Sequence, residues 1–417
     1  MTIATQQKKA KSLLERQLLD AVSSNNFERV RELLLSGADI NAQGSHGETP
    51  LLKSLLCEDH RIFRLLLDGG ADPDMCTNSG YSALAFSCLQ NNFEHVRILL
   101  SRGAKLTVKT QEGWTPLQFA VTNPNLFFYN VDSDFYCQLM EIMYKYAHYF
   151  PDYNPVRIVK LLLESGADPN NSDIYGLSPL MAASGTANHQ TIRLLLKAGA
   201  AVNLHDTDGK SALMHASIAT IEDVINSFIH LRLVGSTVTS ADFISEPNFV
   251  RLRQQFEPQK EFCVHELIRS GADVNDTDQK GIPVIAYASS AGNLNIVKNL
   301  VAHGGDMHTQ SPRGITGLYA AAIHGHDAIV EYFLNEGIDV DTRLSNGETP
   351  LMGAVWSGKV STVQLLIQYG ADVNAKKNIP YQDTEEKGIL TERRHQRREE
   401  SENYDKILRL LADSGAT

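Results

Sequence analysis

One stretch near the end of the chain holds every signal that decides the fold, and it reads SNGETPLMGAVWSGKVSTVQLLIQYGADVN over residues 345–374. Thr349 before Pro350 marks a helix start, because a hydroxyl accepts the first free amides and proline suits the first helical turn. Apolar residues then recur at helical spacing over 363–367, and Gly370 supplies the residue that commonly ends a helix. The stretch predicts a helix, a turn, a second helix and a connection to another such unit.

The same unit recurs along the chain. A glycine followed by a small residue and usually Asp stands at Gly37, Gly70, Gly103, Gly166, Gly199, Gly271, Gly304, Gly337, Gly370 and Gly415. The successive gaps are 33, 33, 63, 33, 72, 33, 33, 33 and 45 residues. Removing one 33-residue unit from each of the three long gaps leaves insertions of 30, 39 and 12 residues. About ten units therefore cover the chain.

At these residues the sequence resembles the ankyrin-repeat family, whose 33-residue unit of a turn and two helices carries the motif T-P-L-H-x-A. The matching runs begin at Thr49, Thr115, Ser178 and Thr349. The resemblance implies an all-α solenoid of stacked helix-turn-helix units with β-hairpin-like connections and two large helical insertions. We expect residues 1–16 to form an N-terminal extension and residues 17–417 to form a single solenoid. Its insertions are expected near residues 122–153, 220–258 and 377–402.

The motif histidine is absent from every unit. Its place is taken by Leu52, Ala85, Gln118, Met181, Met214, Ala286, Tyr319 and Met352. The family's hydroxyl-to-imidazole bonding therefore cannot form as usual, and we expect apolar stacking to hold the units together. In the seventh unit Pro283 replaces even the hydroxyl, which predicts the weakest junction near residues 281–286. The resemblance also implies that hairpin asparagines can be hydroxylated by a suitable enzyme, at Asn41, Asn170, Asn203, Asn275 and Asn374.

Charge and composition exclude several classes of function. The 38 basic and 49 acidic residues give a net charge of -11, which disfavours nucleic acid and anionic membranes as partners. No uncharged apolar run approaches the roughly 20 residues that cross a bilayer. Five cysteines without a CxxC pair indicate reduced thiols. We therefore expect a cytoplasmic protein, with the nucleus or delivery into a host cell as alternatives.

Catalytic motifs are missing from the sequence. It contains no phosphate loop, dinucleotide fingerprint, zinc-protease helix or nucleophile elbow. His324 and His326 flank Gly325, but a Gly-His pair at the turn into the second helix is ordinary in the family pattern. The sequence thus predicts a protein that is not an enzyme and has no cofactor or metal. One alternative is an enzyme whose site lies in the insertions, above all in the insertion near residues 122–153, which is rich in aromatic residues. Another alternative is a bacterial effector or immunity-type inhibitor that binds one target.

Partner-binding residues follow from the resemblance, because partners in the family bind the hairpin tips and inner-helix ends of the concave face. Transferred to this chain, the apolar candidates are Tyr81, Trp114, Tyr175, Leu177, Leu56, Leu89 and Trp356, and the basic candidates are Lys280, Arg313, Arg343, Lys376 and Lys377. Whether the rings anchor a partner or cover neighbouring hairpins stays open at this point. The expected partner is a protein with an apolar segment followed by acidic residues. It would be bound by a monomeric scaffold whose insertions line one rim.

Overall fold

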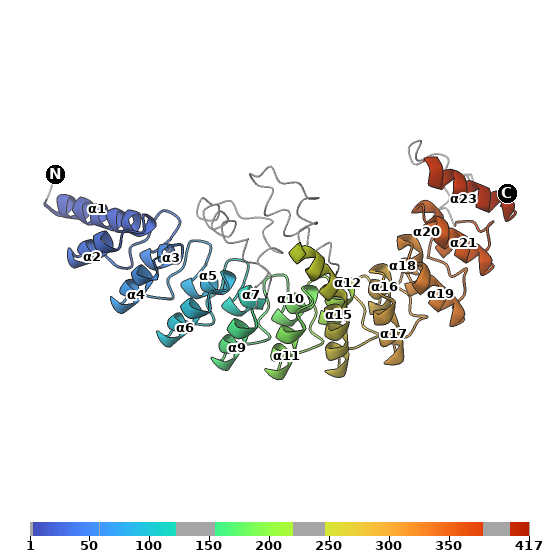
Figure 1. The fold of residues 1–417 in the computed structure, drawn as a ribbon, viewed down its shortest axis with the longest axis horizontal. Coiled ribbons are helices and arrows are strands. Elements are labelled where there is room, and N and C mark those ends of the chain that lie inside the picture. The colour runs from blue at the N-terminus through green and yellow to red at the C-terminus, as the bar shows by residue number, and fades with distance from the viewer. Residues whose placement is uncertain (1–2, 58, 122–154, 220–246, 378–400, 417) are drawn as a thin grey trace. The chain divides into compact units, whose positions relative to one another are not determined.

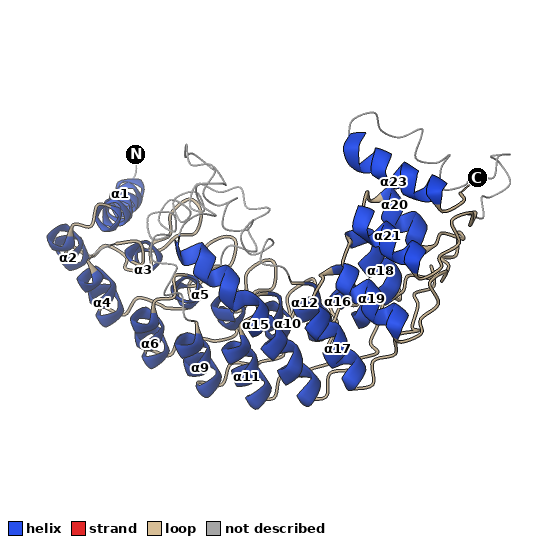
Figure 2. Cartoon of the chain, turned by 45° about the vertical axis from the view of Figure 1, so that its right-hand side comes forward, coloured by secondary structure: helices blue, strands red, loops and turns tan. Residues whose placement is uncertain are grey.

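The computed structural model describes residues 3–57, 59–121, 155–219, 247–377 and 401–416. The chain divides into two compact units, each described by itself: unit 1 comprises residues 1–201 and 221–256, and unit 2 comprises residues 202–220 and 257–417. Throughout the described residues, helices joined by turns are present and strands are not (Figure 2). The predicted all-α class is confirmed.

Unit 1 is a series of helix pairs, and the pairs repeat in chain order. They are α1 (Ile3–Ser23) with α2 (Phe27–Leu35), α3 (Pro50–Ser54) with α4 (His60–Asp68), α5 (Ala83–Leu89) with α6 (Phe93–Ser101), α7 (Pro116–Val121) with α9 (Val156–Glu164), and α10 (Pro179–Gly185) with α11 (His189–Lys197). The first helices of the pairs form one row and the second helices form another (Figure 1). We call these rows the first and second helices.

Unit 2 repeats the arrangement. Its first helices are α12 (Ala212–Ile218), α16 (Val284–Ser290), α18 (Gly317–His324) and α20 (Pro350–Trp356), and its second helices are α15 (Pro247–Arg269), α17 (Leu294–Ala302), α19 (Asp327–Asn335), α21 (Val360–Gln368) and α23 (Ser401–Asp413). The first residues of α15 belong to unit 1 and the rest to unit 2. The described helices therefore follow the predicted helix-turn-helix order.

The predicted helix starts are confirmed by their hydrogen bonds. The hydroxyl of Thr49 accepts the amide of Leu52 over 3.2 Å, and the hydroxyl of Thr316 accepts the amide of Tyr319 over 3.1 Å. At α16 the cap position is Pro283, and no side-chain cap bond is present there. A hydroxyl cap contributes about 1 kcal/mol, so α16 begins without the stabilisation that Thr316 gives to α18.

Asparagines begin several second helices, a signal that the sequence analysis missed. The side chain of Asn26 accepts the amide of Arg29 over 3.1 Å, and Asn92 holds the amide of His95 over the same distance. Asn188 and Asn293 cap α11 and α17 in the same way. Asn is among the best N-cap residues, so the Asn before these four apolar stripes was a readable start signal.

Glycines end the second helices as predicted. Gly37 has a φ of +85°, and the amide of Ala38 bonds to the carbonyl of Leu33 over 3.1 Å, closing the helix in a left-handed turn. The apolar stripes before these glycines are buried, for example Val96 and Leu99, which are both fully shielded from solvent. Burial of about 25 cal/mol per Å² of apolar surface is the main force that stacks such units.

Adjacent hairpins are joined by a ladder of backbone hydrogen bonds. In unit 1 the amide of Gln111 donates to the carbonyl of Ser79 over 3.1 Å. Glycine is required beside this bond: a Cβ on Gly80, whose φ is +86°, would lie 2.6 Å from the carbonyl oxygen of Lys109. Isolated bridges such as that between Cys76 and Ser82 make the connections hairpin-like.

The predicted N-terminal boundary and the three predicted insertions can be compared with the described residues. Helix α1 runs from Ile3 to Ser23, so the limit drawn between residues 16 and 17 falls inside one continuous helix. The insertion near 122–153 lies outside the described residues, as do residues 220–246 of the second insertion and 378–400 of the third. The remainder of the second insertion, from Pro247, is the first part of α15.

Candidate partner-binding surface

The hairpins and first helices form one surface in each unit, which we call the inner face. In unit 1 four rings from two consecutive repeats gather on it. Tyr81 stacks on Phe86 with ring centroids 5.2 Å apart and lies 5.6 Å from Phe119, while Trp114 lies 5.1 Å from Phe119. Burial, reinforced by the charge of Glu112, raises the pKa of Tyr81 to about 12. The cluster binds the two repeats to each other.

Trp114 is part of the framework, so its ring follows the alternative in which it covers a neighbouring hairpin. Its side chain is only 8% exposed, and its indole N–H donates to Oδ2 of Asp173 over 3.1 Å. The other carboxylate oxygen of Asp173 accepts the amides of Tyr175 and Leu177, each over 2.9 Å. Trp114 therefore fixes the next hairpin through one carboxylate, and a partner has little access to its ring.

The tip of that next hairpin is apolar and exposed. Ile174 is 59% exposed and Tyr175 is 61% exposed. The preceding tips are polar, formed by Ser45 with His46, Asn78 with Ser79, and Gln111 with Glu112. Tyr175 was predicted as a partner-binding residue, whereas Ile174 was missed, although it breaks the polar pattern of these tips.

The leucines predicted for the surface differ in exposure. Leu89, which was predicted as a partner-binding residue, is only 3% exposed, so almost none of its side chain is available to a partner. It closes α5 with its side chain turned into the core, because every residue of this short helix is buried. Leu56 and Leu177 are half-buried and contribute only part of their surface to the inner face.

Gln118 takes over the role of the missing motif histidine in its repeat. Its Oε1 accepts the amide of Thr115 over 2.9 Å, and its Nε2 donates to the carbonyl of Leu177 over 3.0 Å. These bonds link the helix start to the next hairpin. Polar bonding between repeats therefore persists here, beside the apolar stacking that the sequence predicts as the main contribution.

In unit 2 the hairpin tips carry exposed cations. Lys280 and Arg313 occupy equivalent tip positions and both are exposed. No carboxylate of the described part of the chain forms an ion pair with either side chain. Arg343 is also exposed, but its guanidinium is tied by hydrogen bonds to the carbonyls of Lys376, at 3.2 Å, and Gly347, at 3.4 Å.

Trp356 lies beside a polar network at the end of α20. It is 50% exposed, and the ammonium of Lys377 stands 5.9 Å from its ring centroid. Lys377 pairs with Glu348 over 3.3 Å, and Glu348 accepts the hydroxyl of Tyr319 over 3.0 Å. Burial and then the charge of Glu348 raise the pKa of Tyr319. Trp356 was predicted as a partner-binding residue, and this role stays a prediction for an exposed ring.

In two hairpins of unit 2, an aspartate bonds to a side chain of the following first helix. Asp206 accepts the ring N–H of His215 over 2.8 Å, and Asp278 accepts the hydroxyl of Tyr287 over 2.7 Å. Burial alone would raise the pKa of Asp206, but the bonds from His215 and from the amide of Lys210 hold it below its usual value. Asp206 and Asp278 thus act as internal braces of these hairpins.

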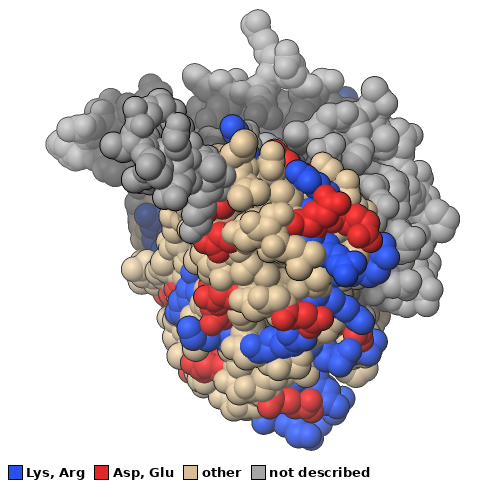
Figure 3. Space-filling model, turned by 90° about the vertical axis from the view of Figure 1, so that its left-hand side faces the viewer, with Lys and Arg blue, Asp and Glu red and all other residues tan. Residues whose placement is uncertain are grey.

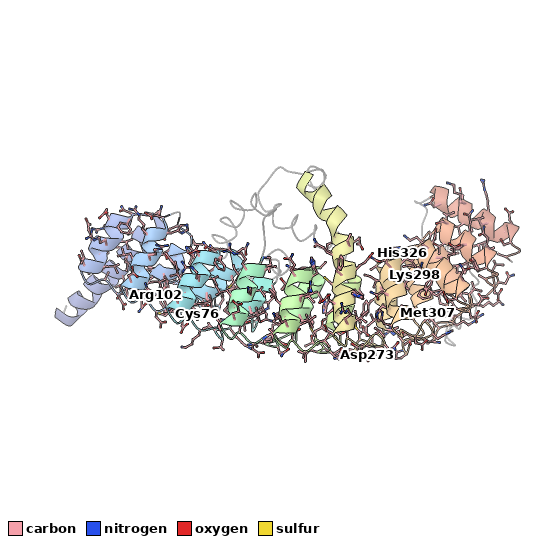
Figure 4. All side chains as sticks on the ribbon, turned by 60° about the horizontal axis from the view of Figure 1, so that its bottom comes forward. Cys76, Arg102, Asp273, Lys298, Met307 and His326 are labelled. Carbon is pink, nitrogen blue, oxygen red and sulfur yellow. The ribbon has the colours of Figure 1, made fainter. Side chains whose placement is uncertain are left out.

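The described side chains offer little for catalysis. Burial raises the pKa of the Cys57 thiol to about 11 and that of Cys263 to about 12, so neither is a thiolate at neutral pH. His324 and His326 each bond to a backbone carbonyl, over 2.9 Å; Figure 4 labels His326. Within the described ranges, no group of three His, Cys, Asp or Glu side chains has the arrangement of a metal site.

Hairpin asparagines link successive repeats by hydrogen bonds to the backbone. Asn203 donates to the carbonyl of Gly271 over 3.0 Å and accepts the amide of Asp273 over 3.1 Å; Figure 4 labels Asp273. Asn275 makes the equivalent bonds to Gly304 and Asp306. The asparagines implied as hydroxylation sites are therefore structural, and their modification stays a prediction.

The outer surface mixes charges of both signs. Lys and Arg alternate with Asp and Glu on the face shown in Figure 3. On the second helices of unit 1, Arg29 pairs with Glu32 over 3.0 Å and Arg97 pairs with Glu94 over 2.7 Å. No helix in the described part of the chain is both long enough and apolar enough to traverse a bilayer.

The repeat architecture and the inner face define a class of protein. The family model for ankyrin repeats, in three copies, matches residues 18–110, 146–240 and 285–377. These matches cover more than half of the chain, which therefore belongs to the ankyrin-repeat family. Ankyrin repeats are generally protein–protein interaction modules. No curated protein was found to match the chain. The count of ten repeats stays a prediction.

Proposed function

We propose that this protein is a scaffold without enzymatic activity, and that it binds a partner protein through the inner face. The observation that carries the proposal is the contrast between framework and tips. Buried rings such as Trp114 are bonded within the stack, whereas Ile174 and Tyr175 in unit 1 and Lys280 and Arg313 in unit 2 stand exposed at its hairpin tips.

Rigidity of the tips supports this role. The turn that carries Tyr175 is closed by two amide bonds to Asp173 and by the bond from the Ile174 amide to the carbonyl of Glu112, over 3.0 Å. Preorganised side chains lose little conformational entropy when a partner binds. Tyrosine combines a large apolar ring with a hydrogen-bonding hydroxyl, which suits it to the centre of an interface.

The partner chemistry follows from the two tip compositions. An apolar segment matches the pair Ile174 and Tyr175, and acidic residues match Lys280, Arg313 and Arg343. The protonated thiols of Cys57 and Cys263 support a role without catalysis. Free thiols at every described cysteine are compatible with a reducing compartment, and we propose the cytoplasm, with a monomeric state.

Affinity capture from the source cell tests the scaffold role. The variant Ile174→Ser plus Tyr175→Ser removes the exposed tip without touching a buried side chain. The matched control is Leu13→Ser plus Leu35→Ser, which removes two leucines that are 57% and 81% exposed on α1 and α2. The proposal predicts one partner that is lost with the tip variant and retained with the control. Retention by the tip variant, or no partner in any sample, would refute it.

A further inference from the structure

We propose that the two consecutive hairpin tips that carry Lys280 and Arg313 form a binding site for an acidic peptide segment. This inference rests on the proposed scaffold function and specifies what unit 2 recognises. The site consists of three groups: the ammonium of Lys280, the guanidinium of Arg313, and the backbone carbonyl of Lys280.

The carbonyl of Lys280 is open because the hairpin ladder is interrupted there. On one side of the gap the amide of Gln279 donates to the carbonyl of Asp208 over 2.9 Å, and on the other side the amide of Ser345 donates to the carbonyl of Arg313 over 2.9 Å. Between these two bonds, Pro312 occupies the place of the donor residue, and proline has no backbone N–H. Among the described residues no other donor reaches the Lys280 carbonyl.

The two hairpins are nevertheless in close contact. A Cβ on Gly281 would lie 2.4 Å from Cδ of Pro312. The tips therefore stand side by side without the bond that joins their neighbours, and Lys280, which carries the open carbonyl, is an exposed residue. A backbone acceptor left in this state gains a hydrogen bond when a ligand brings an N–H to it.

The cations flank this acceptor. Lys280 and Arg313 are separated by 33 residues, so they hold the same place in consecutive repeats. Both side chains are exposed, and neither is paired with a carboxylate of the described residues. The tip positions next to this pair are different: Asp208 precedes it, and Asn346 follows it. At this tip position, basic residues in unit 2 therefore occur only in the two repeats beside the ladder gap.

A peptide Asp or Glu complements all three groups. Its backbone N–H fits the Lys280 carbonyl, and its carboxylate accepts charge-assisted bonds from lysine and from the forked donors of arginine. A nucleic-acid backbone supplies the anion without the amide donor. The chain's net charge of -11 also repels a long polyanion, whereas a short acidic segment meets only the local field.

Titration of the purified full chain with a labelled oligoglutamate peptide tests the site, with oligoglutamine of the same length as the neutral probe. We expect oligoglutamate to bind and oligoglutamine not to bind. Lys280→Glu plus Arg313→Glu should weaken binding about tenfold and flatten its salt dependence. The control Arg269→Glu plus Lys298→Glu changes the net charge equally at exposed positions on α15 and α17, and it should leave binding unchanged.

Pro312→Ser tests the carbonyl without changing any charge. The restored amide should close the ladder onto the Lys280 carbonyl, raise the melting temperature and weaken oligoglutamate binding several-fold. Equal binding by the charge-reversed protein, equal binding of oligoglutamine, or unchanged affinity in Pro312→Ser would overturn the site. Tighter binding of a single-stranded oligonucleotide than of oligoglutamate would also overturn it. Because the probe is synthetic, a failed capture from cells affects only the scaffold proposal, and a failed titration affects only this site.

Discussion

The indole N–H of Trp114 donates to Oδ2 of Asp173 over 3.1 Å, across 59 residues of sequence. The bond joins two consecutive hairpins of unit 1. It explains why the most prominent aromatic candidate of the sequence is part of the framework, and why the exposed tip lies one repeat further on, at Ile174 and Tyr175.

Replacement of Trp114 should lower stability. Trp114→Phe keeps a ring against Phe119 but leaves the Asp173 oxygen without its donor, so the free energy of unfolding should fall by about 1–3 kcal/mol. Urea denaturation measures this difference. Tyr175→Ser is the matched control, because an exposed side chain should change stability by no more than about 0.5 kcal/mol. Equal losses in both variants would contradict the framework role.

His95 should make unit 1 sensitive to acid. Burial, and after it the charge of the neighbouring His60, lower the pKa of His95 to about 4. The pKa of a histidine in the unfolded chain is about 6.5. The unfolded chain therefore binds the proton first, and the free energy of unfolding should fall as the pH drops from about 6.5 to about 4. His95→Leu should lose less stability over this range. Parallel curves for the two proteins would show that His95 does not contribute.

The junction near residues 281–286 should be the easiest to open in unit 2. Pro283 provides no cap for α16, and Pro312 interrupts the ladder beside it. Pro283→Thr should restore a cap worth about 1 kcal/mol and slow amide exchange in α16. Hydrogen exchange measured by mass spectrometry tests this, with α20, which Thr349 caps, as the internal reference. Uniform protection of α16 and α20 in the native protein would contradict the prediction.

The bonds that hairpin asparagines make to the next repeat should also stabilise unit 2. Asn275→Asp keeps the acceptor for the Asp306 amide but removes the donor to the Gly304 carbonyl, so we expect a loss of about 1 kcal/mol. Asn295→Ala is the control, since the Asn295 amide bonds only to the half-buried Glu261 side chain in the described residues. Thermal denaturation distinguishes the two. A loss no larger for Asn275→Asp than for Asn295→Ala would count against the proposed linkage.

The local features of the fold were predictable from the sequence, because each depends on a few neighbouring residues. The glycine at each helix end, such as Gly37, and the hydroxyl at each helix start, such as Thr49, act within one turn of backbone. Their spacing of 33 residues was sufficient to predict the repeat family.

The candidate surface was less predictable, because exposure depends on contacts made after the repeats stack. Trp114 is held within the stack by its bond to Asp173, which follows an insertion in the sequence. Leu89 is buried because every residue of its short helix is enclosed. Neither condition is visible in a single repeat. Ile174 could have been found by comparing the tips with one another, since the preceding ones are polar.

Site-specific photo-crosslinking in the source cell tests the central claim most directly. A photoreactive amino acid replaces either Tyr175 or Lys280 on the tips, or either Leu35 or Lys298 on the second helices. The account predicts that one protein crosslinks from the tip positions, and that its crosslinked peptide is apolar at Tyr175 and acidic at Lys280. Crosslinks to that protein from Leu35 and Lys298 alone would contradict binding through the inner face.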